Sequence, residues 1–383
     1  MIYFDHSATT QIFPEALDAY VKASQKIFGN PSSLHDLGNQ ADALLTQARQ
    51  QIADIMGVSS SEVYFTSGGT EGINWILKGT AIEKRDFAQR IIISAIEHPA
   101  VYKTVQQLAK LRFTVDFAPV DQHGFVEIDG LKNLLGNDVI LVSIIGVNNE
   151  IGSIQPIKQI ANLLENYPTI HFHVDAVQAV GKIAKENYLS KRVDFATFSA
   201  HKFHGPRGVG FIYLKQGKRI ASLLTGGGQE KNQRSGTENI PGIVAMAKAL
   251  RLSIQDYPKK IKHVLALRNA LGKFLKSYEN VKLFTDMTND FAAHILTFGL
   301  KKVRGEVMVH ALAKQQIYLS TTSACSSRKK IPANTLKAMN LPNNIIETAV
   351  RLSLDASNTL EEVQQFMEVF SQLYKKFESV FKK

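Results

Sequence analysis

Phe195-Ala196-Thr197-Phe198-Ser199-Ala200-His201-Lys202 is the stretch that decides the fold of this chain of 383 residues. Its first four residues predict a short buried strand, and a hydroxyl, an imidazole and an amine follow that strand. In open α/β sheets, ligands bind beyond the carboxyl ends of the strands. Lys202 is therefore a candidate ligand-binding residue, although most lysines simply lie on the surface. Ser199 and His201 are placed to reach a phosphate group beside it.

The sequence on both sides of this stretch alternates helical periodicity with short apolar runs. Strands are predicted at 62–66, 90–94, 113–117, 139–145, 170–174, 195–198 and 209–214. Among the intervening helical patterns, 41–56 ends at Gly57 and 70–78 follows a glycine-rich turn. Strands separated by helices favour a mostly parallel central sheet with helices on both faces, an α/β fold.

After Pro241 the pattern changes. A long helical stretch, interrupted near Tyr257-Pro258, is followed by a strand pattern at 293–298 and a helix at 305–315. A strand pattern at 349–354 and a final helix from 359 complete the chain. This order predicts a smaller α+β domain. We expect residues 15–250 to form a large cofactor-binding domain, and residues 1–14 with 251–383 to form the small one.

The composition narrows the class of protein. A hydrophobic content of 44% and a charged content of 21% are typical of a globular protein. No apolar run is long enough to span a bilayer, and the first residues do not resemble a signal peptide. The net charge of +11 favours solvated basic surfaces over direct nucleic-acid binding, because no nucleic-acid-binding signature accompanies it. A single cysteine excludes an internal disulfide and a thiolate-rich metal site, and it indicates a cytoplasmic location.

That cysteine, Cys325, lies in an unusual sequence context. Ser, Thr and Ala precede it, and Arg328 and its neighbouring lysines follow shortly after. A free cysteine is usually buried among apolar residues. Reactive thiolates instead favour polar, electropositive surroundings. Cys325 is therefore predicted to be reactive.

Three further strand ends carry polar residues. Ser67-Gly68-Gly69-Thr70 follows a predicted strand and opens a helix, which is a suitable anion site, although glycine also serves any tight turn. Asp175 and Gln178 follow another strand, and His98 follows a third. A pyridoxal phosphate site consists of a lysine, an acid that pairs with the ring nitrogen, and a helix N-terminus that binds the phosphate. Taken singly, Asp175 could be a helix cap, Gln178 a surface residue and His98 a cap or structural histidine.

At this point the chain resembles a known family, the cysteine desulfurases of the NifS/IscS type, in the class V aminotransferase superfamily of fold-type-I enzymes. The similarity covers nearly the whole chain in the order of the family. The matching segments are 3–10, 29–33, 65–71, 97–100, 147–152, 173–178, 199–202, 226–239, 323–327 and 350–353. Some positions differ from the common pattern: His6, Ser7, Gly69, Gly72, Phe203, His204 and Arg328.

The resemblance implies a role for each matching residue. Lys202 would form the Schiff base with pyridoxal 5'-phosphate, Asp175 would pair with the pyridine nitrogen and Gln178 with the ring hydroxyl. His98 would stack on the ring and manage the substrate thiol proton. Asn149 and Arg351 would bind the substrate carboxylate, although Arg351 could instead pair with an acid such as Asp355. The phosphate would be held by Gly69, Thr70, Ser199 and His201, and by Thr237 from the neighbouring subunit of a homodimer.

The implied reaction removes sulfur from L-cysteine, gives L-alanine and leaves a persulfide on Cys325. The resemblance implies a sulfur-acceptor protein as partner, either a tRNA-thiolating enzyme or an iron-sulfur scaffold. It implies neither a bound metal nor an association with a membrane. The basic charge tilts the expectation towards tRNA thiolation. A transaminase or a selenocysteine lyase on the same scaffold is the first alternative, and Cys325 argues against a transaminase. A non-catalytic sulfur-relay or RNA-associated subunit is the second, and the complete set of Lys202, Asp175 and Arg351 argues against it.

Overall fold

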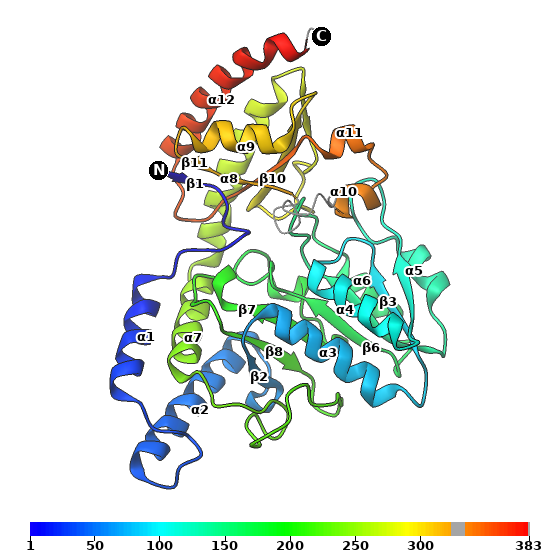
Figure 1. The fold of residues 1–383 in the computed structure, drawn as a ribbon, viewed down its shortest axis with the longest axis vertical. Helices are drawn as coiled ribbons and strands as arrows, with labels where there is room; N and C mark the ends of the chain where they lie inside the picture. The colour runs from blue at the N-terminus through cyan, green and yellow to red at the C-terminus, as the bar shows by residue number, and fades with distance from the viewer. Residues whose placement is uncertain (323–333, 382–383) are drawn as a thin grey trace.

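A seven-stranded sheet forms the centre of the larger part of the molecule (Figure 1). The computed structural model describes residues 1–322 and 334–381. In spatial order, the strands of this sheet are β2 (Val63–Thr66), β8 (Gly210–Leu214), β7 (Phe195–Ser199), β6 (His171–Asp175), β5 (Val139–Ile145), β3 (Arg90–Ser94) and β4 (Thr114–Ala118). From β7 to β4 neighbouring strands are parallel, and only β8 runs antiparallel to both of its neighbours. The α/β fold with a mostly parallel sheet is confirmed.

Helices cover both faces of this sheet because its strands are apolar on both sides. Ile92 of β3 packs into the cluster that contains α2 (Asp36–Met56), α6 (Ile157–Leu164) and α7 (Ile240–Ile254). Ile91 and Ile93 face the opposite way, into the cluster with α3 (Gly69–Lys84) and α4 (Pro99–Lys110). Every residue of β5 is buried, as two-sided burial requires.

The predicted elements match the observed ones closely, and they differ mainly at their ends. α2 ends at Gly57 as predicted, and this glycine has the left-handed φ of 66° that commonly closes a helix. α3 is longer than the predicted 70–78, since Gly79, Thr80 and Ala81 continue its buried face. The interruption near Tyr257 is also confirmed, because α7 stops at Ile254 and α8 (Tyr257–Lys276) begins there. The remaining elements of this part are α1 (Pro14–Lys26), η1 (Ser60–Glu62), α5 (Ile128–Leu134), η2 (Lys185–Asn187) and η3 (Ala200–Lys202).

A second, antiparallel sheet lies above the first in Figure 1. Its order is β12 (Ser320–Thr321), β13 (Ala349–Ser353), β10 (Ile295–Leu300) and β9 (Val281–Leu283). α8, α9 (Gly305–Ala313) and α12 (Leu360–Phe381) supply the apolar cluster around Phe298, Phe366 and Phe370. Two short helices, α10 (Asn334–Ala338) and α11 (Asn343–Ile346), precede β13. The two sheets have separate apolar clusters, and the domain boundary at residue 250 stays a prediction.

The N-terminal segment ties the two sheets together. β1 (Ile2–Tyr3) pairs with β11 (Ile317–Tyr318), and Asp5 bridges to Ser353 at the end of β13. A few residues later the Thr10 N–H donates to the carbonyl of His201, just beyond β7. This segment therefore crosses from the small sheet to the carboxyl end of the large one.

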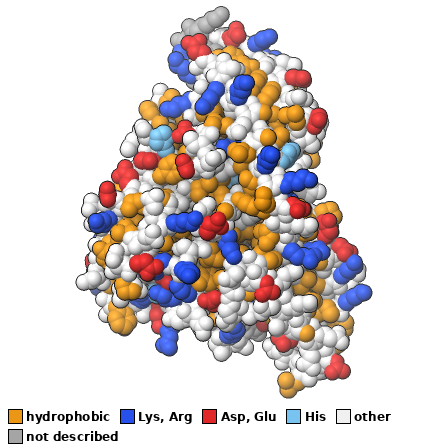
Figure 2. Space-filling model, turned by 180° about the vertical axis from the view of Figure 1, so that it is seen from behind, with side chains coloured by type: hydrophobic (Ala, Val, Ile, Leu, Met, Phe, Trp, Pro, Cys, Tyr) orange, Lys and Arg blue, Asp and Glu red, His pale blue; other side chains and the backbone are white. Residues whose placement is uncertain are grey.

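The surface carries mixed charge. On the face shown in Figure 2, Lys and Arg side chains are interspersed with Asp and Glu. Such mixing is typical of a solvated protein surface. In the part of the chain that the structure describes, no helix is both long and apolar enough to cross a bilayer.

Candidate active site

Lys202 lies at the end of η3, directly beyond the carboxyl end of β7. Its Nζ donates to the carbonyl of Ser7 at 2.5 Å and to that of Ala8 at 2.8 Å. These carbonyls belong to the N-terminal segment that crosses between the sheets. The amine is therefore held at the junction of the two sheets.

Asp175 ends the neighbouring strand β6 and is 2% exposed. Its Oδ1 accepts a hydrogen bond from the Val177 N–H at 3.0 Å. Burial raises the pKa of this carboxyl to about 6, and the Val177 N–H and the nearby Lys202 oppose that rise. A cationic or N–H partner would therefore stabilise the ionised form, which is what a protonated pyridine nitrogen offers.

Gln178 also faces the junction. Its Nε2 donates to the Ser7 carbonyl at 2.8 Å, and its Oε1 accepts from Lys182 Nζ at 3.0 Å. The surface position weighed for Gln178 is wrong, because the residue is only 4% exposed.

The N-terminus of α3 forms one wall of the site. Gly68, with φ of 149°, precedes the helix, and a Cβ on it would lie 3.4 Å from Ser199 Oγ. Gly69 packs against Val177 so closely that a Cβ would lie 2.7 Å from the valine methyl. The free N–H groups of this helix end, with the hydroxyls of Thr70 and Ser199, are the donor set that a phosphate needs.

His98 is the helix cap weighed for it, and its position in the cavity wall also agrees with the predicted place beside a ring. It is the N-cap of α4, where its Nδ1 accepts from the Ala100 N–H at 3.1 Å, and it also lines the cavity. Desolvation, reinforced by Lys202, lowers its pKa to about 4. The ring is therefore neutral near pH 7, and since Nδ1 accepts, the proton is on Nε2.

Arg351 enters the site from β13 of the small sheet and is 4% exposed. Its Nη2 pairs with Asp5 Oδ1 at 2.9 Å, and its Nη1 donates to the Asn149 carbonyl at 2.8 Å. The pairing with Asp355 weighed from the sequence is wrong, because the acid beside it is Asp5. Its Nε has no hydrogen-bond partner among the described residues, which leaves a donor for a ligand.

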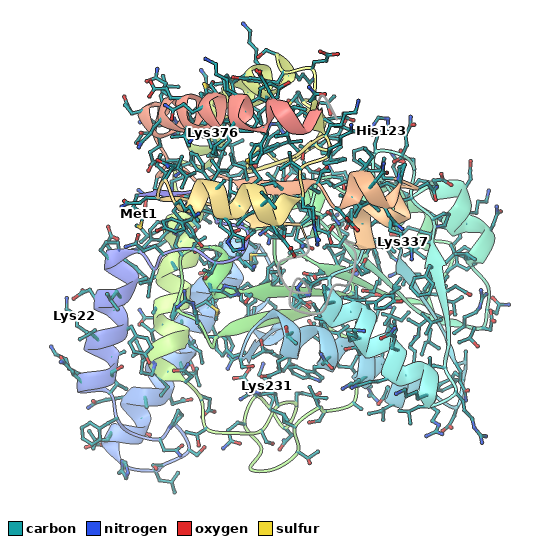
Figure 3. All side chains as sticks on the ribbon, turned by 45° about the horizontal axis from the view of Figure 1, so that its top comes forward. Met1, Lys22, His123, Lys231, Lys337 and Lys376 are labelled. Atoms are coloured by element: carbon teal, nitrogen blue, oxygen red, sulfur yellow. The ribbon has the colours of Figure 1, made fainter. Side chains whose placement is uncertain are left out.

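Nearly all of the predicted site residues come together around one cavity of about 300 Å³. The predicted residues that line it are Gly69, Thr70, His98, Asn149, Asp175, Gln178, Ser199, His201, Lys202 and Arg351. Thr237 does not line it. That residue is exposed on the 224–239 segment, which also carries Lys231 at the lower edge of Figure 3. Cys325, the remaining predicted residue, lies outside the described residues.

Two groups of the site were not singled out from the sequence. The carbonyls of Ser7 and Ala8 hold Lys202. Every residue has a backbone carbonyl, so the sequence does not indicate which ones act as acceptors. Glu150 also lines the cavity, and its Oε2 is buried without a hydrogen-bond partner in the described part of the chain. Burial raises the Glu150 pKa to about 7, although Arg351 and Thr335 oppose the rise. The available signal was that Glu150 is the only ionisable residue of the sequence segment 144–154.

The residues present fit pyridoxal phosphate by their chemistry. The cavity joins an amine, a buried carboxylate and a helix N-terminus flanked by hydroxyls, which are the three groups that this cofactor requires. Among the residues that the structure describes, no group of three or more His, Cys, Asp or Glu side chains is arranged to hold a metal ion.

Comparison with known proteins agrees with this chemistry. The aminotransferase class-V family profile matches residues 2–366. The chain is 51% identical over 380 residues to a NifS/IcsS protein homolog of Lactobacillus delbrueckii subsp. bulgaricus, with 99% of each chain covered. It is 39% identical to the cysteine desulfurase IscS of Methanosarcina thermophila, covering 99% of this chain and 93% of that protein. A solved NifS-like protein superposes with a TM-score of 0.92 at 37% identity, covering 98% of this chain and 99% of the other.

The chain belongs to the class V aminotransferase family. Members of this family are pyridoxal phosphate-dependent enzymes, so the predicted cofactor and enzyme class are confirmed at the level of the family. Within the family, its relatives are cysteine desulfurases of the NifS/IscS type, as the sequence motifs predicted.

Proposed function

We propose that this chain takes the sulfur atom of L-cysteine, releases L-alanine and carries the sulfur on Cys325 to an acceptor protein. One observation supports it above the others. A single cavity is lined by Lys202 and Asp175 from the large sheet and by Arg351 from the small sheet. An α-amino acid has an amino group and a carboxylate on one carbon, so it needs recognition groups on both sides of a pocket.

Lys202 and Arg351 act on different groups of the bound amino acid. The bound cofactor supplies the electron sink that makes the Cα–H bond acidic. Lys202 Nζ, held by the Ser7 and Ala8 carbonyls, takes that proton. Arg351, whose Nε has no partner within the described part of the chain, orients the carboxylate from the opposite side together with the Asn149 side chain.

Cys325 performs the sulfur transfer. Its thiolate forms a bond to the substrate sulfur, and the electron pair of the Cβ–S bond goes to the carbon. Protonation of that carbon and return of the Cα proton from Lys202 give alanine, and the transferred sulfur stays on Cys325 as a persulfide. The thiolate is the reactive form, and Arg328, three residues later in the sequence, would favour it by its positive charge.

The substrate thiol proton must be taken up by a base near the cavity. His98 was the expected base, but its Nδ1 is occupied by the Ala100 N–H and its Nε2 carries a proton. We therefore assign His98 to stacking on the ring and to donation from Nε2. Glu150 is better suited to accept the proton, since its pKa of about 7 matches a neutral working pH.

A homodimer with shared sites is part of the proposal. Two ion pairs, Arg234–Glu71 and Arg49–Glu230, anchor the segment that carries Thr237, yet Thr237 itself faces outward. Phe28 is 75% exposed and Leu34 is 99% exposed, which is unusual for large apolar residues on a free surface. Thr237→Ala should weaken cofactor retention only in the dimer. Equal loss in a monomeric variant would refute a contribution from the neighbouring subunit.

The persulfide role is tested with Cys325→Ala. This variant should still bind the cofactor and change its visible absorption on adding L-cysteine, but it should form no alanine beyond background. Ser326→Ala is the matched control, because it alters the adjacent residue without removing the thiol. Full alanine turnover by Cys325→Ala, or a requirement for a keto acid, would overturn the proposal in favour of a transaminase.

For the acceptor we propose a tRNA-thiolating enzyme, on the basis of the net charge of +11. The enzyme would be loaded with radiolabelled L-cysteine and mixed with a purified tRNA-thiolating enzyme or with an iron-sulfur scaffold. Faster transfer to the thiolating enzyme supports the proposal, and faster transfer to the scaffold refutes it. A cytoplasmic location also remains a prediction.

A further inference from the structure

A second cavity, of about 240 Å³, shares Lys202 with the first. One side is formed by Val180, Gly181 and Lys182 of the large sheet region and by Phe203 and His204 after η3. The other side comes from the small part of the molecule, through α8, His294 and residues 354–357. The cavity therefore lies at the junction of the two sheets, next to the catalytic lysine.

Lys182 lines this cavity, and among the described residues no carboxylate forms a hydrogen bond with its ammonium group. Its only hydrogen-bond partner among the described residues is the neutral Oε1 of Gln178, at 3.0 Å. Burial, aided by the positive charge of Lys202, lowers the pKa of Lys182 to about 7. A desolvated ammonium group with one neutral partner is stabilised by any anion that reaches it.

The carboxylate that lines the cavity is not available to neutralise Lys182. Asp355 is the only carboxylate among the lining residues. Its Oδ2 accepts from His204 Nε2 at 2.9 Å, and its Oδ1 accepts from the N–H and the hydroxyl of Ser357 at 3.0 and 2.9 Å. Both oxygens are thus engaged elsewhere, and the Asp355 pKa is held well below its usual range by these donors against the effect of burial.

His294 adds an independent sign of a missing ligand. It lines the cavity, is 3% exposed, and neither of its ring nitrogens has a hydrogen-bond partner among the described residues. Buried polar groups are almost always hydrogen-bonded, so an unpaired imidazole in a cavity wall calls for a partner inside the cavity. A neutral imidazole offers one N–H donor.

We propose that this cavity binds a small carboxylate anion, whose oxygens are held by Lys182 and His294. The side chains of the cavity wall indicate what the rest of the ligand is like. Phe13, Val264 and Leu354 are apolar and suit a short hydrocarbon body. An inorganic phosphate would present more oxygens than these donors can satisfy, and an amino acid would bring its ammonium group close to Lys182.

The charge relations link this site to the catalytic amine. An anion beside Lys182 stabilises the ammonium form and offsets the positive field that Lys182 exerts on Lys202. Occupancy therefore raises the proton affinity of both amines. The titratable and charged groups that bear on Lys182 and its cavity are Lys202, Lys260, Arg268, Arg351, Asp355, His6, His204 and His294.

The pH dependence follows from the charge of Lys182. Without ligand it loses its proton as the pH rises through about 7, while a carboxylate stays ionised throughout this range. Binding should be on the order of tenfold tighter at about pH 6 than at about pH 8.5, with proton uptake at the higher pH.

The test is calorimetric titration of the cofactor-loaded enzyme with butyrate, in buffers of different ionisation enthalpy. Lys182→Met and His294→Asn should each weaken binding at least about tenfold, which is the loss of one charge-assisted or buried hydrogen bond. Lys84→Met is the matched control. Lys84 is also a partly buried lysine with a lowered pKa, but it bonds to the Thr169 carbonyl and does not line the cavity.

Arg351→Ala separates this site from the substrate pocket. Butyrate binding that persists in Arg351→Ala and is lost in Lys182→Met supports the proposal. Binding lost in Arg351→Ala but kept in Lys182→Met would overturn it, as would no detectable binding to the unaltered enzyme at about pH 6. Tighter binding of inorganic phosphate than of butyrate would overturn the assignment to a carboxylate. Proton uptake by the unaltered enzyme provides a readout if a variant does not fold.

Discussion

Arg351 and Asp5 form an ion pair of 2.9 Å between β13 and the N-terminal segment, and both side chains are largely buried. Asp5 is in turn fixed by Ser320, whose hydroxyl donates to Oδ2 at 2.6 Å. The two residues are far apart in the chain, and Asp5 directs the guanidinium that faces the substrate cavity. We therefore expect Asp5 to be a positioning residue for Arg351, the group proposed to bind the substrate carboxylate.

Asp5→Asn should raise KM for L-cysteine about tenfold with little change in kcat, which corresponds to about 1.4 kcal/mol of lost positioning. The measurement is steady-state alanine formation. Glu306→Gln is the control, because that acid pairs with Arg304 on the exposed surface, where a salt bridge contributes little. A lower KM in Asp5→Asn would show instead that Asp5 competes with the substrate for Arg351.

Lys202→Ala should abolish the visible absorption band of the attached cofactor and all alanine formation, because the amine at the end of η3 is removed. Absorption spectra of the purified variant test this directly. Lys84→Ala should keep the band, since Lys84 lies outside the cavity. An unchanged spectrum in Lys202→Ala would refute the assignment of this lysine.

Asp175→Asn should stabilise the protein when the cofactor has been removed. Burial raises the folded-state pKa to about 6, above the usual unfolded value of about 4, so the ionised carboxyl destabilises the fold at neutral pH. The expected gain is about 1–3 kcal/mol at pH 7, and it should vanish as the pH falls below about 4. Urea unfolding of the cofactor-free protein measures it.

Asp194→Asn is the matched comparison and should have the opposite sign. Asp194 is 1% exposed but is paired with Arg192 at 2.7 Å and Lys218 at 3.3 Å. Removing one partner of such a buried pair costs about 3–5 kcal/mol. Destabilisation of both variants would contradict the view that Asp175 awaits a cationic partner.

Glu150→Gln should lower kcat by roughly 10²–10⁴-fold if Glu150 accepts the substrate thiol proton. In the unaltered enzyme, activity should rise as the pH passes through about 7, because only the ionised carboxylate is a base. That rise should be missing in Glu150→Gln. A pH profile that keeps its rise near neutrality would assign the proton to another group.

Local patterns predicted the elements of the large sheet to within about a residue, because apolar strands and capped helices are specified by neighbours in the chain. The long helix α3 was underestimated, since its later turns are stabilised by contacts with distant residues such as Ala221, whose N–H donates to the Gly79 carbonyl. The partner of Arg351 was misjudged for the same reason. Periodicity says nothing about which distant acid a strand arginine meets.

The sequence by itself predicted the α/β fold, the cofactor and most of the residues that line the cavity, because most of them lie near a strand end or helix start that local pattern locates. Only the tertiary structure decided how those groups are held. It brought the Ser7 and Ala8 carbonyls to Lys202, Asp5 to Arg351, and Lys182 and His294 to one cavity. The physical reason is that backbone acceptors and long-range charge pairs depend on how the two sheets pack together, which no short stretch of sequence encodes.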